Sequence, residues 1–254
     1  SPIQIARVVM FATLVVTVSL ITLGSASSDL EQTSTGVYET GTASGGGIGK
    51  VYMGREIASV MSRSRMNRLD RPGRERDERT DLLVEALPVE ADHAVADIGA
   101  GTGYFSFRVA ERVPDGVVYA VDIQQEMLDE IERRKRERDV DNIETLLGEV
   151  HDPGLSEQSA DLIFIVDAYH EFSHPREMGE AMYQALRPGG HLIVVEDRAE
   201  ASSRPPGKLN GMTEAQARKE ITAVGFNWLR TESFLPQQHF LVFQRPASPP
   251  RSAN

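Results

Sequence analysis

A cluster of glycines gives the strongest indication of a ligand site in this sequence. In VADIGAGTGYF, residues 95–105, Gly99, Gly101 and Gly103 directly follow a short apolar run. Glycine loses more conformational freedom on folding than any other residue, so this density is costly unless the backbone must approach another group closely. Peptide N–H groups at such a bend can hold a nucleotide, and we therefore expect a ligand-binding loop here.

An acidic residue stands at a second position that suits a nucleotide. Asp122 ends the apolar run of residues 117–122. It follows the glycines by about 20 residues, and a carboxylate at this spacing can accept hydrogen bonds from ribose hydroxyl groups. Both features require strands whose carboxyl ends meet at one edge of a sheet.

The rest of the chain supplies such strands. Between residues 51 and 245, short apolar runs rich in branched residues alternate with longer segments of helical period, which is typical of a parallel sheet covered by helices. The expected parallel strands are residues 94–98, 117–122, 143–147, 162–166 and 191–196. FNWLRTESF and HFLVFQR predict a closing antiparallel hairpin. The predicted fold class is α/β, Rossmann-like and doubly wound, with a mostly parallel seven-stranded sheet and a C-terminal antiparallel hairpin.

Two helices are marked by local patterns. Met178 and Met182 lie on the apolar side of the segment 175–186, which has a helical period and predicts core packing for both. Thr213 precedes Gln216 by three residues, the spacing of a capping box at the start of a second helix.

The glycine segment departs from one nucleotide motif and matches another. A dinucleotide-binding G-x-G-x-x-G motif starting at Gly99 would need its third glycine at Tyr104. The pattern G-x-G-x-G, with Asp97 two positions before the first glycine, instead resembles motif I of the class I S-adenosylmethionine-dependent methyltransferases. LRPGGHLIVVE, residues 186–196, is similar to the helix, turn and fifth-strand signature of the same family.

The resemblance implies S-adenosylmethionine as the cofactor. In this family Asp122 would hold the ribose, Ile123 would face the adenine and Glu149 would lie near the adenine edge. The cofactor-binding residues expected on this basis are Asp97, Gly99, Ala100, Gly101, Gly103, Asp122, Ile123, Gly148, Glu149 and Asp167.

The resemblance also implies the chemistry. Methyl transfer from a sulfonium is an in-line displacement, so the protein has to align the acceptor and remove a proton when the acceptor is oxygen or nitrogen. Asp167, Tyr169 and His170 follow the fourth expected strand and are the candidate catalytic residues. His170 is the preferred general base because imidazole titrates near neutral pH, while a structural or substrate-orienting role stays open.

Composition restricts the partners. The net charge of -11 argues against binding to nucleic acid, whose phosphates demand clustered lysine and arginine. The chain has no cysteine, which excludes disulfides and thiolate chemistry, and no His and carboxylate spacing predicts a metal site. The predicted partner is a small-molecule methyl acceptor, with its identity and the oligomeric state left open. The alternatives are a noncatalytic module that binds S-adenosylmethionine or another nucleotide, and an NAD(P)-dependent oxidoreductase.

The amino-terminal part of the chain has the pattern of a targeting segment. Residues 1–26 place Arg7 before an uncharged run and a group of small residues, as in a signal peptide or a membrane anchor. This pattern predicts export to a periplasmic or other extracytoplasmic location, or membrane attachment through residues 3–23, in preference to a cytoplasmic location.

The remaining boundaries follow composition and the resemblance. Residues 27–50 are rich in Ser, Thr and Gly and are predicted to be a flexible linker, and residues 246–254 a disordered tail. Residues 51–245 form the expected methyltransferase domain. Its first part, residues 51–80, is expected to be a helical lid over the cofactor, lined by Tyr52, Met53 and Arg55, or else an extra packing helix.

Overall fold

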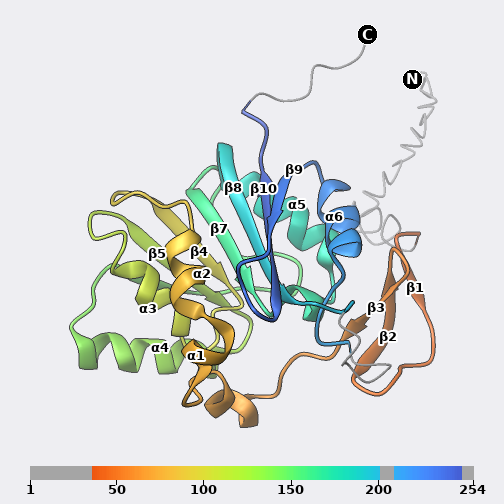
Figure 1. Cartoon of the computed structure of the whole chain (residues 1–254), viewed down its shortest axis with the longest axis horizontal. Coiled ribbons are helices and arrows are strands. Elements are labelled where there is room, and N and C mark those ends of the chain that lie inside the picture. Colours follow the sequence, from red (N-terminus) through yellow and green to blue (C-terminus); the bar gives the residue numbers. More distant parts are fainter. Residues whose placement is uncertain (1–35, 201–208, 248–254) are drawn as a thin grey trace, which may run out of the picture. The chain divides into compact units, whose positions relative to one another are not determined.

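The structure is a computed structural model that describes residues 36–200 and 209–247 (Figure 1). All of these residues except Gly36 belong to one compact unit, which begins at Val37. The signal peptide or anchor predicted for residues 1–26 lies outside the described residues, as does most of the predicted tail. None of the helices in the described ranges combines the length and the apolar character needed to cross a membrane.

A seven-stranded sheet forms the centre of the domain, with the strand order β6-β5-β4-β7-β8-β10-β9 (Figure 1). The first five of these strands pair in parallel, while β10 is antiparallel to both β8 and β9. The bounds are β4 Ala94–Ile98, β5 Val117–Asp122, β6 Ile143–Leu147, β7 Ala160–Val166, β8 Leu186–Asp197, β9 Asn227–Glu232 and β10 Gln238–Gln244. The predicted doubly wound, mostly parallel sheet with a C-terminal hairpin is confirmed.

Helices cover both faces of this sheet. One apolar core contains residues of α2, α3 and α4, and a second contains residues of α5 and α6, on the opposite side in Figure 1. The helices are α1 Arg74–Glu78, α2 Thr80–Ala86, α3 Tyr104–Ala110, α4 Gln125–Arg138, α5 Pro175–Ala185 and α6 Glu214–Thr222. Met178 and Met182 of α5 are buried in the second core, as their spacing predicted.

One half of the predicted capping box is present at α6. The Thr213 side chain accepts a hydrogen bond from the backbone N–H of Gln216 at 3.1 Å. Replacing Thr213 by alanine removes this partner, so we expect the free energy of unfolding to fall by about 1 kcal/mol. Urea unfolding of the two proteins measures the difference, and Thr213→Ser, which keeps the hydroxyl, should stay close to the wild type.

The segment before the central domain differs from the prediction. Residues expected to be a linker (27–50) and a helical lid (51–80) contribute a three-stranded antiparallel sheet of β1 Tyr38–Thr40, β2 Gly47–Tyr52 and β3 Arg55–Ala58. Tyr52 and Ile57 are fully buried, and this burial compensates for the weak strand propensity of the glycines. The rest of the segment holds a 3₁₀ helix, η1 Arg63–Arg68, and α1, so it is only partly helical.

Candidate functional site

A cavity of about 790 Å³ lies at the carboxyl ends of β4, β5 and β7. The strand order reverses between β4 and β7, and open α/β sheets bind their ligands at such a reversal. The loops after these strands line one side of the cavity, and the segment of residues 58–78 lines another. The sequence therefore brings its glycine loop and the residues after β5 and β7 to one site.

The backbone of the glycine loop has a conformation that residues with a Cβ atom adopt only with strain. Gly99, Gly101 and Gly103 have φ angles of 79°, 55° and 79°, in the left-handed region. A Cβ atom on Gly99 would lie 2.7 Å from the Cβ of Ala168, and one on Gly101 would lie 2.6 Å from Cδ1 of Leu69. Gly99 and Gly101 line the cavity, so the glycines serve both the turn and a close approach to its contents.

Three predicted cofactor residues support this loop from outside the cavity lining. Asp97 is buried and accepts a hydrogen bond from Oγ of Ser106 at 2.6 Å, which ties the end of β4 to α3. Burial raises the pKa of Asp97 to about 7, against the opposing effect of the Ser106 bond. Ala100 is buried, and Gly103 caps the start of α3. The predicted loop lies at the cavity, and Asp97, Ala100 and Gly103 hold its shape.

Asp122 occupies the position expected of a ribose-binding group. Its Oδ2 accepts the backbone N–H of Gly101 at 2.9 Å and its Oδ1 accepts that of Gln124 at 2.9 Å. Burial raises the pKa of Asp122, and the two N–H groups act in the opposite direction. The carboxylate lines the cavity, where each oxygen keeps a further lone pair for a ligand.

The predicted adenine-binding residues lie beside Asp122. Ile123, Gly148 and Glu149 all line the cavity, and Ile123 is 39% exposed although it is a large apolar residue. Exposed apolar surface next to a carboxylate suits a nucleoside, whose base is flat and whose sugar carries hydroxyl groups.

His170 is held by a buried carboxylate. Its Nδ1 lies 2.7 Å from Oε2 of Glu196, and its backbone N–H donates to Oε1 of the same residue at 3.1 Å. Its Nε2 lies 3.7 Å from Oε1 of Glu171, which also lines the cavity. Burial lowers the pKa of His170, but Glu196 and Glu171 outweigh it and raise the pKa to about 9.

This pKa changes the role predicted for His170. A group with a pKa of about 9 is only about 1% deprotonated at pH 7. The raised pKa favours an imidazolium that donates hydrogen bonds over the neutral general base predicted from the sequence. The cause is Glu196, which is 26 residues away in the chain and gives no local signal beside His170.

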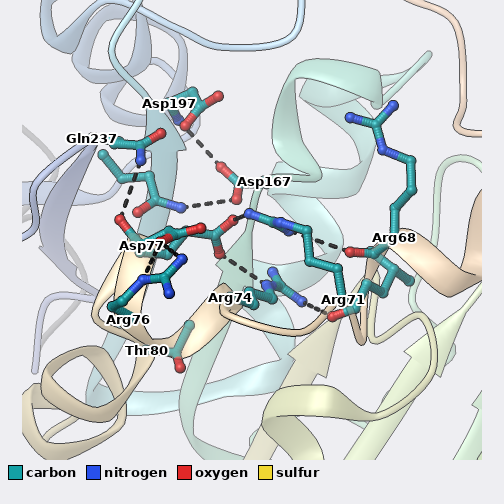
Figure 2. A network of polar contacts seen from close by, with 12 residues as sticks. Arg68, Arg71, Arg74, Arg76, Asp77, Thr80, Asp167, Asp197 and Gln237 are labelled. Atoms are coloured by element: carbon teal, nitrogen blue, oxygen red, sulfur yellow. Dashed lines mark hydrogen bonds and ion pairs between the residues drawn. The ribbon is translucent and has the colours of Figure 1, made fainter.

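The other two candidate catalytic residues differ in position. Tyr169 is 1% exposed, packs against Phe172 with ring centroids 5.3 Å apart, and is not part of the cavity lining. Asp167 does line the cavity. Its Oδ1 accepts the backbone N–H of Asp197 at 3.2 Å and its Oδ2 accepts Nε2 of Gln238 at 2.9 Å (Figure 2). Burial and the nearby carboxylates of Glu196 and Asp197 raise the pKa of Asp167.

Residues 63–79 cover one side of the cavity and are called its cover below. They contribute charged groups that were not predicted from the sequence. Arg71 and Arg74 both pair with Glu78, and all three line the cavity (Figure 2). Nε of Arg74 lies 2.8 Å from Oε2 of Glu78. The spacing of Arg74 and Glu78, four residues apart in RERDE, is a local signal that could have indicated this pair.

The residues expected to line the lid have another role. Tyr52, Met53 and Arg55 are absent from the cavity lining in the described part of the chain. Arg55 instead pairs with Glu220 of α6, with Nε 2.7 Å from Oε1, and donates from Nη1 to the carbonyl oxygen of His170 at 3.0 Å. Arg55 therefore joins β3 to the loop that carries His170.

Comparison with known proteins supports this arrangement. Residues 95–190, which run from β4 into β8, match a family model described as a methyltransferase domain. The arsenite methyltransferase of Halobacterium salinarum is 29% identical over 101 residues, which are 39% of this chain and 26% of that protein. The ubiquinone/menaquinone biosynthesis C-methyltransferase of Roseobacter denitrificans is 27% identical over 119 residues, 46% of this chain and 47% of that protein. The chain thus spans about half the length of these curated relatives or less.

The fold has a solved counterpart. The crystal structure of an S-adenosylmethionine-dependent methyltransferase from Aquifex aeolicus has a TM-score of 0.68 and 21% sequence identity, over 73% of this chain and 99% of that one. At this identity the likeness concerns the fold. The matched family model, the motif around the glycine loop and the order of the seven strands agree, and together they support a methyltransferase domain of the class I S-adenosylmethionine-dependent type.

Proposed function

We propose that this chain transfers a methyl group from S-adenosylmethionine to a small-molecule acceptor. The observation that carries the proposal is the carboxylate of Asp122 next to Gly99 and Gly101 in one cavity at the reversal of strand order. The cavity of about 790 Å³ lies within the range of roughly 300 to 1,000 Å³ that small-molecule sites occupy.

The residues of this cavity fit the nucleotide. Gly99 and Gly101 allow the backbone to approach the ligand, and Asp122 offers its remaining lone pairs to the ribose. Ile123 and Gly148 provide surface for the adenine. When the cofactor is bound, its sulfonium supplies an electrophilic methyl group, and the electrons of the broken bond remain on sulfur.

The chain's own residues would orient the acceptor and take up its proton. Glu196 fixes Nδ1 of His170, so the imidazolium serves as a positioned hydrogen-bond donor. Glu171 lies beside it, and its Oε2 accepts the backbone N–H of Met61 at 3.1 Å. Burial raises the pKa of Glu171 despite the opposing effect of His170, which makes it a stronger base than an ordinary glutamate. We assign the proton-accepting role to Glu171 for acceptors that carry a proton.

The relatives support a small acceptor. One of them is named for arsenite and another for ubiquinone/menaquinone biosynthesis. Arsenite and quinones are small molecules. This chain contains no cysteine and so has no thiolate to hold arsenite, which favours an organic acceptor.

Binding of nucleotides by the full chain tests the proposal. Isothermal titration with S-adenosylmethionine, S-adenosylhomocysteine and NADH should give binding for the two adenosyl compounds and none for NADH. Methyl transfer from labelled S-adenosylmethionine into a metabolite extract then separates an enzyme from a noncatalytic binding module. Binding of NADH alone would overturn the assignment.

We expect Asp122→Asn to weaken the binding of S-adenosylhomocysteine by about 1 to 3 kcal/mol, because the ribose loses a charged acceptor. The amide oxygen can still accept the N–H of Gly101, so the loop keeps its support. Asp129→Asn on the exposed face of α4 is the matched control and should leave the affinity unchanged. Equal affinity in the Asp122 variant and the wild type would contradict the ribose contact.

A further inference from the structure

The cover of the cavity has a charge opposite to that of the whole chain. Residues 63–79 contain seven arginines and four acidic residues, a net charge of +3, whereas the complete chain has a net charge of -11. A cationic segment over a cavity in an anionic protein draws anionic ligands toward that cavity.

Most of these arginines are neutralised by carboxylates. Arg63 pairs with Glu126, Arg71 and Arg74 with Glu78, Arg76 with Asp77, and Arg79 with Asp81. Arg65 and Arg68 are the exceptions. Within residues 36–200 and 209–247, neither of their guanidinium groups has a hydrogen bond or an ion pair.

The two unpaired arginines line the cavity. Arg65 and Arg68 both belong to η1 and both contribute to the cavity wall. Figure 2 shows the Arg68 guanidinium extending away from Arg71 and Arg74, and no dashed line joins it to the other residues drawn. Two guanidinium groups three residues apart on one short helix can act on the same anionic group.

Six carboxylates line the same cavity, those of Glu78, Asp122, Glu149, Asp167, Glu171 and Asp197, and at least three of them have charged or backbone donors beside them. Glu78 is held by two arginines, Glu171 lies beside the His170 imidazolium, and Asp122 accepts two backbone N–H groups. An incoming anion therefore meets two available cations, whereas these acidic groups are compensated locally.

The cavity wall also offers apolar surface. Val60 and Val150, which line the cavity, are 41% and 42% exposed, and Met61, Phe172 and Leu209 contribute further apolar surface. Large exposed apolar residues around a cavity indicate a ligand that covers them.

We propose that the methyl acceptor is an anion with an apolar body, and that Arg65 and Arg68 bind its anionic group. This inference rests on the proposed methyl transfer and adds the class of acceptor. An aromatic or aliphatic carboxylate, sulfonate or phosphate ester has the required chemistry, because guanidinium groups bind such oxyanions through two parallel hydrogen bonds.

Two fluorescent probes with the same apolar body test this assignment. 8-Anilinonaphthalene-1-sulfonate carries the anion, and N-phenyl-1-naphthylamine lacks it. Each is titrated into the full chain saturated with S-adenosylhomocysteine. In the variant Arg65→Met/Arg68→Met we expect the dissociation constant of the sulfonate to rise by about tenfold to a hundredfold, and that of the neutral amine to stay unchanged.

Arg76→Met is the matched control, because Arg76 belongs to the same cationic segment but pairs with Asp77 and does not line the cavity. It should bind both probes as the wild type does. Sulfonate binding that is equal in the double variant and the wild type, no sulfonate binding to the wild type, or an equal loss of both probes would each overturn the proposal.

The nucleotide's own carboxylate is the competing source of an anion. S-adenosylhomocysteine carries this carboxylate and 5′-methylthioadenosine lacks it, so their affinities for the double variant distinguish the two sources. Unchanged affinities for both compounds support an acceptor site. A loss confined to S-adenosylhomocysteine would assign the arginines to the nucleotide and overturn the proposal. Failure of the wild type to bind either compound would instead refute the proposed function.

Discussion

Replacing Arg55 by methionine should lower the free energy of unfolding by about 3 to 5 kcal/mol at pH 7. The guanidinium is 11% exposed, and its partner Glu220 is fully buried, with two contacts of 2.7 and 2.9 Å between them. Methionine fills similar space but leaves the Glu220 carboxylate buried without its cation. Gln216 donates to the same carboxylate at 2.8 Å, which is insufficient to replace a charge.

Urea unfolding of the wild type and the variant measures this loss. Arg176→Met is the matched control, because Arg176 forms an exposed pair with Glu180 and its loss should cost about 0.5 kcal/mol or less. The double variant Arg55→Met/Glu220→Leu removes both charges and should regain most of the stability. A difference below about 1 kcal/mol for Arg55→Met alone would show that the buried pair contributes little.

The second large effect concerns His170 and the pH dependence of stability. The pKa of His170 is raised in the folded protein to about 9 from 6.5, since Glu196 and Glu171 outweigh the effect of burial. The stabilisation is therefore complete below about pH 6.5 and is lost as the pH rises through about 9. We expect this group alone to account for a decrease of about 3 kcal/mol in the free energy of unfolding over that interval.

Glu196→Gln removes the charge that holds the imidazolium. We expect the variant to be less stable than the wild type near pH 6 and to approach it near pH 10, because its His170 is neutral over most of this range. Urea unfolding from about pH 6 to about pH 10 measures both curves. Glu196 also raises the pKa of Asp167 and of Glu171, so the difference between the curves reports the His170 pair together with these two carboxyl groups. Parallel curves would contradict the assignment of a charged His170.

Local patterns in the sequence were sufficient to predict the strands of the sheet and the part of the site formed by the glycine loop and Asp122. The glycine loop and Asp122 are defined by residue type and by spacing along one strand, loop, helix and strand unit, which fixes their neighbours. The parallel strands follow from short branched runs that alternate with helical segments, a pattern that predicts the strands but not their order in the sheet. These features depend on contacts between elements that are adjacent in the chain.

The remaining features depend on contacts that are distant in the chain. The charge of His170 is set by Glu196, the position of Arg55 by Glu220, and the strands β1 to β3 by burial of Tyr52 and Ile57. Asp97 was assigned to the cofactor because the motif includes it, whereas its hydrogen bond to Ser106 shows a supporting role. A single sequence contains no local pattern for such pairings.

The cover, residues 63–79, is anchored by buried residues at its two ends, which affects how a ligand enters the cavity. Arg55 secures β3 before the cover, and the buried residues of α2 secure the chain after it, while η1 between them has no buried residue. Leu69, next to η1, reaches down to the glycine loop, where its Cδ1 would lie 2.6 Å from a Cβ atom on Gly101. The middle stretch is held by exposed polar contacts such as the Arg63–Glu126 pair, so we expect it to open at a lower free-energy cost than β3 or α2 when a ligand enters.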